Sequence, residues 1–242
     1  MRLVLISQYF CNKFFCKIHM KTEHHTITIT KKADISSVWL IPTKYKAVLI
    51  IAHGAGRDMN SVFVNQIHEG IARHGILTVK FNFPYMERGL RAPNTPHVLE
   101  ETWQKVIDAV IEKTGVTRKQ IFVSGKSMGG RYATILASKE DLYAGIILYG
   151  YPLHAPGKPD KPRFNHLKVI HEPLLFFQGT RDSLCQLAVF QPLLEKISPK
   201  PTLHIIDGGD HSFKLLKRMD RSEQSVFDEV VQLSVEWIKQ RI

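Results

Sequence analysis

Short, almost wholly apolar segments recur along the sequence, and they constrain the fold more than any other feature. A strand that is nearly continuous in apolar residues must be covered on both faces, as in a parallel sheet flanked by helices. The segments of this kind are residues 46–53, 77–83, 121–124, 145–151, 174–179 and 203–207. Two earlier stretches, 25–32 and 37–43, alternate apolar and polar residues instead, which is typical of a half-exposed antiparallel edge.

Helical patterns separate these apolar segments. The clearest covers residues 96–114, where apolar residues recur at helical spacing, Thr95 and Pro96 provide a start and Gly115 provides a stop. We expect further helices over residues 63–74, from about Met128 onward, over 187–197 and over 226–238. Strands that alternate with crossover helices after an antiparallel start predict an α/β fold, with a mostly parallel sheet and helices on both faces.

The chain has 242 residues and 44% hydrophobic content, which suits one globular domain. We expect that domain to cover residues 21–242, with residues 1–20 as an N-terminal appendage. The three cysteines do not form a disulfide framework, which favours a reducing compartment and a cytoplasmic location. No apolar run reaches the roughly 18 to 20 residues that a membrane helix needs, so we expect no membrane span.

The chain is basic, with 33 Lys and Arg against 22 Asp and Glu and a formal charge of +11. This balance favours acidic partners or an anionic substrate, although scattered charge is also typical of a basic solvated surface. No nucleic-acid motif is present, so no nucleic-acid partner is expected. We expect no metal or cofactor, since the adjacent His24 and His25 would point to opposite faces of a strand. The sequence predicts no particular oligomeric state.

Residues 125–130 read Gly-Lys-Ser-Met-Gly-Gly and directly follow an apolar segment. A Gly-x-Ser-x-Gly run becomes meaningful when a strand enters it and a helix leaves it, and both are predicted here. The turn would hold Ser127 in a strained conformation, while Gly125 and Gly129 remove β-carbons that would collide. We therefore predict that Ser127 is a nucleophile; the alternative is an ordinary polar residue in a glycine-rich bend.

A serine hydroxyl needs a histidine base and a carboxylate that orients it. Asp182 and His211 each come just after a predicted strand, so both would stand at the carboxyl edge of the sheet, where ligands bind in such folds. In this strand-turn-helix class the acid and then the histidine follow the serine along the chain. Asp210 and Asp207 are alternatives for the acid, although Asp210 is awkwardly adjacent to the histidine.

Two backbone amides are expected to bind the oxyanion that forms beside the serine. One belongs to Met128, at the start of the following helix. The second would lie in the loop after the first parallel strand, "HGAGRDMNS", as the amide of Ala55 or Gly56. The alternative is a plain glycine turn.

Basic residues in the neighbouring loops are candidates for contact with the substrate, and could bind a carboxylate or phosphate on it. The alternative is a generic basic surface. The proposed substrate-binding residues are Arg57, Lys126, Arg88 and Tyr85, with Arg91 and Arg131 nearby. The segment 152–173 is too short for a large cap domain, which favours a small or extended substrate.

The runs "HGAG", "GKSMGG", "QGTRD" and "GGDHSF" together resemble the α/β-hydrolase fold, and more closely its small dienelactone-hydrolase-like members. Longer stretches, such as "FNFPYMERG" and "GYPLHAPGKP", are similar to the testis-expressed and KAN-type α/β-hydrolase-like proteins. The resemblance covers residues 45–215. It implies an eight-stranded sheet and a serine-hydrolase triad of Ser127, Asp182 and His211. Dienelactone hydrolases carry cysteine at the nucleophile position, so their substrate is not implied here.

The sequence thus predicts a carboxylesterase-type serine hydrolase that acts on a small ester or acyl substrate through an acyl-enzyme. An acyltransferase with the same triad is one alternative, because it shares the acyl-enzyme. A non-catalytic interaction module that has kept the fold is another.

Overall fold

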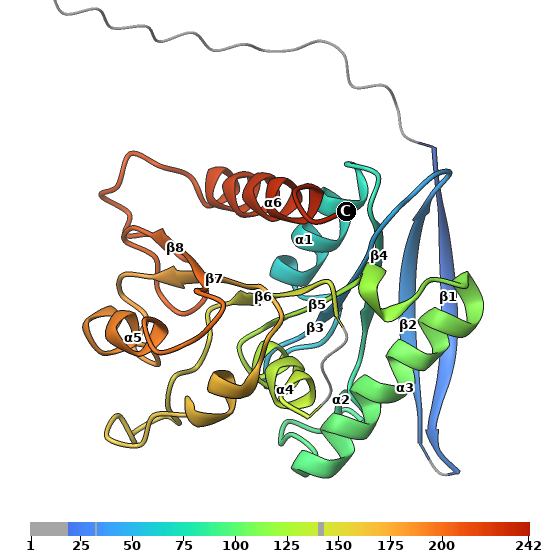
Figure 1. Ribbon diagram of the computed structural model, residues 1–242, viewed down its shortest axis with the longest axis horizontal. Helices are drawn as coiled ribbons and strands as arrows, with labels where there is room; N and C mark the ends of the chain where they lie inside the picture. Colours follow the sequence, from blue (N-terminus) through green and yellow to red (C-terminus); the bar gives the residue numbers. More distant parts are fainter. Residues whose placement is uncertain (1–18, 32, 140–142) are drawn as a thin grey trace, which may run out of the picture.

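The computed structural model describes residues 19–31, 33–139 and 143–242, and forms a layered α/β structure around an eight-stranded sheet (Figure 1). The strands are β1 (Met20–Thr30), β2 (Ala33–Pro42), β3 (Val48–Ala52), β4 (Leu77–Phe81), β5 (Ile121–Lys126), β6 (Gly145–Tyr149), β7 (Leu174–Gly179) and β8 (Thr202–Ile206). The helices are α1 (Val62–Ala72), α2 (Pro84–Glu87), α3 (Pro96–Thr114), α4 (Met128–Ala137), α5 (Leu187–Leu194) and α6 (Glu223–Lys239). Short 3-10 turns, η1 (Arg118–Gln120) and η2 (Asn165–Val169), complete the described elements.

The strands lie side by side in the order β1-β2-β4-β3-β5-β6-β7-β8. β1 pairs antiparallel with β2, β2 pairs antiparallel with β4, and every later pairing is parallel. This arrangement confirms the expected fold class, a mostly parallel eight-stranded sheet with an antiparallel start. β5, the strand that carries the serine motif, lies between β3 and β6 in the middle of the sheet.

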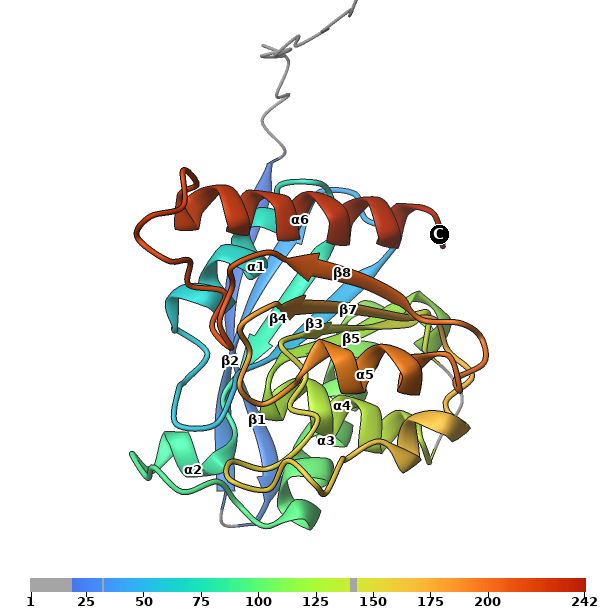
Figure 2. The same cartoon turned by 90° about the vertical axis from the view of Figure 1, so that its left-hand side faces the viewer.

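The apolar strands are covered on both faces because successive side chains point to opposite sides of the sheet. In β3, Val48 and Ile50 belong to one apolar core, while Leu49 and Ile51 belong to a second. Helices α3 and α4 cover the first core, and α1 and α6 cover the second (Figure 1). Figure 2 shows these two helical layers on opposite sides of the twisted sheet.

Element boundaries differ from the expected ones mainly at chain turns and at the sheet edge. α1 and α5 end before the expected residues 74 and 197, because the chain tightens there: the amide of His74 bonds to Ile71, and that of Ile197 to Leu194. β1 begins at Met20 rather than at residue 25. Residues 21–24 are polar, so hydrophobic alternation does not mark the start of this strand, yet Met20 pairs with Pro42 across the hairpin.

Residues 1–18, the main part of the expected appendage, lie outside the described residues. The division of the chain into appendage and domain therefore stays a prediction, as does the cytoplasmic location. In the described part of the chain, no helix combines the length and the apolar composition that crossing a bilayer requires.

The parallel strands bring four loops to one edge of the sheet. The loops after β3, β5, β7 and β8 all leave from carboxyl ends of strands, which point the same way in a parallel sheet. The segment between β6 and β7 contains only the short turn η2 as regular structure. Within the described ranges, no large cap domain covers this edge, as the sequence predicted.

Candidate active site

Ser127 lies in a sharp turn between the end of β5 and the start of α4. Its backbone has φ 50° and ψ −113°, a conformation that costs a non-glycine residue about 1 to 3 kcal/mol. Its amide donates to the carbonyl oxygen of Tyr149 at 3.0 Å. A β-carbon on Gly129 would lie 2.6 Å from the carbonyl oxygen of Ala52, and one on Gly125 would lie 2.4 Å from the next helix's backbone. The glycines therefore allow strand and helix to close on each other.

A continuous chain of hydrogen bonds links Ser127, His211 and Asp182. His211 Nε2 lies 2.8 Å from Ser127 Oγ, and His211 Nδ1 lies 2.7 Å from Asp182 Oδ2. The Asp182 side chain is fully buried, while that of His211 is 25% exposed. A carboxylate can only accept, so Nδ1 carries the proton of the neutral ring and the Nε2 lone pair faces the serine hydroxyl. This geometry suits a base beside a nucleophile.

The remaining hydrogen bonds of Asp182 hold the carboxylate in one orientation. Gln178 Nε2 donates to Oδ2 at 2.5 Å, and the amide of Leu184 donates to Oδ1 at 2.8 Å. Gln178 Oε1 in turn accepts from the amide of Tyr151 at 2.9 Å. Sequence reasoning missed Gln178, although a single polar residue in the apolar run 174–179 was a signal.

The two alternative carboxylates serve other contacts. Asp210 Oδ1 accepts from the amides of Ser212 and Lys214 at 2.7 and 3.0 Å, so it caps the turn after β8. Asp207 Oδ1 accepts from the hydroxyl of Thr180 at 3.4 Å. Of the three acids considered, Asp182 is the one that the structure places against the histidine.

The expected oxyanion donors, Ala55 and Met128, line the same hollow as Ser127. No hydrogen bond of the described residues uses the backbone N–H of either one. A β-carbon on Gly54 would lie 3.5 Å from the Ser127 β-carbon, so this loop runs directly past the serine. Gly56, the other sequence candidate, does not line the hollow.

His53 fixes the loop that carries Ala55. Its ring is buried; Nδ1 donates to the carbonyl oxygen of Gly54 at 2.9 Å, and Nε2 accepts from the amide of Phe83 at 3.1 Å. Burial lowers the pKa of His53 to about 4, so the ring stays neutral and both contacts persist near neutral pH. The sequence contains a signal for this role, a histidine directly after an apolar strand, but sequence analysis assigned no role to His53.

The proposed substrate-binding residues do not line the hollow at Ser127. Arg57 and Arg88 are exposed elsewhere. The Tyr85 side chain is buried, with its ring 5.8 Å from that of His53. These placements correct the expectation from the sequence, which located the residues on the right loops but could not say which way each side chain turns.

Lys126 also departs from its expected place. Its side chain is buried and Nζ donates to the carbonyl oxygen of His211. Nζ lies 5.9 Å from the ring centre of Phe63 and 5.4 Å from that of Phe213. Burial lowers the pKa of Lys126 to about 8. Lys126 therefore supports the loop of the histidine and does not face the hollow.

The hollow beside Ser127 has a volume of about 280 Å³. Its walls come from the loop after β3, the start of α3 with the loop before it, the first turns of α4, the segment between β6 and β7, and the loop after β7. The charged side chains in its lining are Arg131, which the sequence placed near the site, and Arg163, which it did not.

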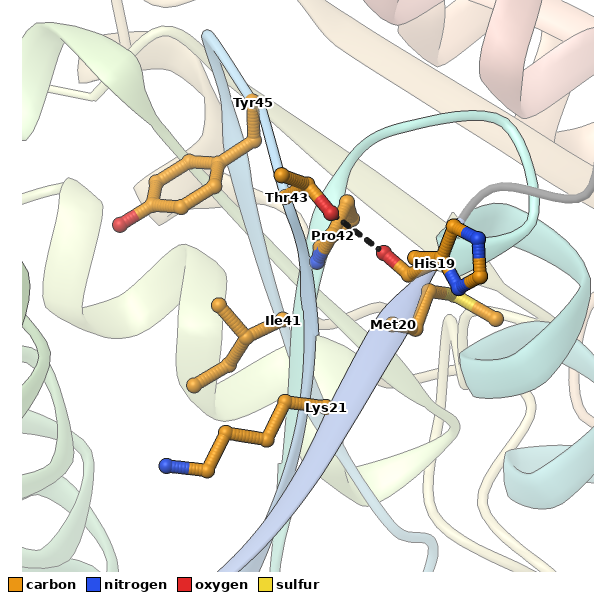
Figure 3. A pocket seen from close by; sticks show the side chains of 7 residues that line it. All are labelled: His19, Met20, Lys21, Ile41, Pro42, Thr43 and Tyr45. Atoms are coloured by element: carbon orange, nitrogen blue, oxygen red, sulfur yellow. Dashed lines mark hydrogen bonds between the residues drawn. The ribbon is translucent and has the colours of Figure 1, made fainter.

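A second hollow, of about 420 Å³, lies at the end of the β1–β2 hairpin (Figure 3). Thr43 Oγ1 donates there to the carbonyl oxygen of His19 at 3.0 Å. This hollow is at the edge of the sheet, whereas Ser127 follows the central strand β5, and it contains none of the three linked residues. Throughout the described ranges, no cluster of His, Cys, Asp and Glu side chains is arranged to hold a metal ion.

Comparisons with known proteins agree with this architecture. A family model described as "Alpha/beta hydrolase domain" matches residues 45–239. A dienelactone hydrolase from Anabaena variabilis superposes with a TM-score of 0.73 at 20% identity, over 92% of this chain and 99% of that one. An alpha-beta serine hydrolase homologue from Coxiella burnetii gives 0.69 at 19% identity, over 88% and 96%. Est1E from Butyrivibrio proteoclasticus gives 0.70 at 14% identity, over 89% and 99%.

Proposed function

The chain belongs to the α/β-hydrolase family, and from this premise we propose that it is a serine hydrolase that cleaves esters through an acyl-enzyme on Ser127. The observation that carries the proposal is the unbroken hydrogen-bond chain from Ser127 Oγ through His211 to the buried Asp182. Structural neighbours titled as an esterase domain and a dienelactone hydrolase support an ester as the substrate.

The first half-reaction would form the acyl-enzyme. Ser127 Oγ attacks the carbonyl carbon of the ester while its proton passes to His211 Nε2, and Asp182 stabilises the imidazolium. The amides of Ala55 and Met128 donate to the oxyanion, and removal of one such donor typically costs about 3 kcal/mol at the transition state. The carbon–oxygen bond to the alcohol then breaks, and the alcohol leaves with the proton from Nε2.

The second half-reaction would return the enzyme to its starting state. Water gives a proton to His211 Nε2 as its oxygen attacks the acyl carbon. The bond to Ser127 Oγ then breaks, the serine recovers the proton and the carboxylic acid leaves. A hollow of about 280 Å³ without a large cap suits a small ester.

The proposal is tested by covalent labelling together with ester hydrolysis. We expect a fluorophosphonate probe to label the wild-type protein and p-nitrophenyl butyrate to be hydrolysed, and Ser127→Ala to abolish both. His211→Ala should lower kcat by about a thousandfold or more. Ser138→Ala, at the far end of α4, is the matched control and should behave as wild type.

Wild-type protein that is neither labelled nor active on short esters would refute the proposal and favour a non-catalytic module. Labelling with little free acid released, but with acyl product on an added alcohol, would indicate acyl transfer instead. Mass spectrometry of the labelled peptide identifies the modified residue.

A further inference from the structure

We propose that the substrate carries an anionic oxygen group, a carboxylate or a phosphate, and that Arg131 and Arg163 bind it beside Ser127. This inference rests on the proposed hydrolase function and specifies its substrate class. It is carried by the two arginines that line the hollow together with the serine.

The backbone around both arginines is well anchored. Arg131 is one helical turn beyond the serine, and its amide donates to the Ser127 carbonyl oxygen at 3.0 Å. Ser127 and Arg131 both line the hollow, so the first turn of α4 places this arginine close to the serine. The carbonyl oxygen of Arg163 accepts from the hydroxyl of Tyr151 at 2.7 Å, and the amide of Arg163 donates to the carbonyl oxygen of Leu153 at 2.5 Å.

Neither guanidinium is neutralised by the protein. Among the described residues, no carboxylate forms an ion pair with Arg131 or Arg163, and no Asp or Glu lines the hollow. Arg131 Nε is buried without a hydrogen-bond partner. Burial and then the positive charge of Arg131 lower the pKa of Arg163, which means that the two cations lie close enough to repel each other.

Such an arrangement is unfavourable until an anion arrives. Guanidinium groups bind carboxylate and phosphate oxygens through paired, charge-assisted hydrogen bonds. An anion between Arg131 and Arg163 would relieve their repulsion and supply the counter-charge that the protein does not. Arg131 lies over the ring of Tyr132, 5.3 Å from its centre, which is a weaker partner than an anion. A purely apolar substrate would fill the same space and leave both cations without a counter-charge.

A histidine adds a further polar contact to the same hollow. His154 lines it and is 3% exposed. Nδ1 donates to the carbonyl oxygen of Ala155 at 2.9 Å, while Nε2 is buried without a partner. His154 therefore brings an acceptor without a partner to the wall of the hollow.

The test compares anionic esters with neutral esters of similar length. The monoester of adipic acid with p-nitrophenol is paired with p-nitrophenyl hexanoate, which places charge on the acyl side. On the alcohol side, p-acetoxybenzoate and p-acetoxyphenyl phosphate are each compared with neutral p-acetoxybenzamide. We expect wild-type kcat/KM to favour an anionic ester of at least one series by about tenfold or more.

Variants then assign the preference to the two arginines. Arg131→Gln and Arg163→Gln should each reduce the anionic-to-neutral ratio of kcat/KM by about tenfold or more, mainly through KM. Arg131→Lys retains the charge without the planar fork and should recover part of the ratio. Arg218→Gln removes the same charge from an exposed site outside the hollow, so it should leave the ratio unchanged and separates binding from long-range attraction.

Binding without turnover distinguishes failure of this inference from failure of the hydrolase proposal. Titration calorimetry of Ser127→Ala with adipate, hexanoate and phenyl phosphate should show an anion that binds more tightly than neutral hexanamide, and Arg163→Gln should weaken it. Labelling of Ser127 combined with equal kcat/KM for charged and neutral esters would overturn the anion site alone. Unlabelled protein that still binds the anion through Arg163 would overturn only the hydrolase proposal.

Discussion

Replacing Lys126 by methionine probes how the site is held together. Lys126 is buried beneath the loop of His211 and donates to that residue's carbonyl oxygen. Burial lowers its pKa from 10.5 to about 8, although the negative charges of Asp182 and Asp210 act to raise it. Methionine keeps the length of the apolar stem but removes the titrating group and the hydrogen bond.

The size of the effect follows from linkage between proton binding and folding. The unfolded chain keeps the Lys126 proton up to pH 10.5, while the folded chain loses it near pH 8. In this window the unfolded state binds more protons, so the free energy of unfolding rises with pH. The two pKa values imply a cost of about 3 kcal/mol at neutral pH, and about 1 kcal/mol of it is regained between pH 7 and 9.

The assay is urea unfolding of wild type and Lys126→Met at pH 7, 8 and 9. The free energy of unfolding of wild type minus that of the variant should increase by about 1 kcal/mol across this range. Lys119→Met, at an exposed lysine on η1, is the control and should show no such trend. A pH-independent difference for Lys126→Met would refute the argument that the buried ammonium is desolvated.

Two further substitutions test the frame of the site. Gln178→Leu removes a donor to Asp182 and leaves the amide of Tyr151 unpaired. We expect the free energy of unfolding, measured with urea, to fall by about 2 to 4 kcal/mol, and kcat for ester hydrolysis to fall by about tenfold. Wild-type values in both assays would contradict this role of Gln178. Gly129→Ala would place a β-carbon 2.6 Å from the carbonyl oxygen of Ala52, so we expect loss of fluorophosphonate labelling, and a folded variant labelled at the wild-type rate would show that the turn tolerates the overlap.

The sequence predicted the parallel part of the sheet well because burial on both faces leaves a strong signal. Each residue of β3 is buried, on one core or on the other, so the strand reads as an uninterrupted apolar run. The start of β1 left no such signal. Its residues Lys21 and Thr22 are exposed on an edge strand, where backbone pairing with β2 forms the strand without an apolar face.

The predicted nucleophile, base and acid come together because all three follow parallel strands at one edge, a placement that chain order alone can anticipate. The residues that contact the substrate were harder to predict from the sequence. Lys126 could have been placed from strand periodicity. Phe122, four residues earlier in the same strand, faces the core covered by α1 and α6, so Lys126 points to that side too. Arg163 depends on an irregular segment, whose path no periodic pattern specifies.

The same alternation divides the site between the two faces of the sheet. His211 is supported from one side, where Lys126 packs near Phe213 of the second core. The hollow opens toward the other side, where α4 and the segment between β6 and β7 supply Arg131 and Arg163. Ser127 stands at the edge between them. Because the groups that would activate the serine and those that would recognise the substrate belong to different layers, changes at the arginines can alter which ester is accepted while the hydrogen-bond chain behind the serine stays intact.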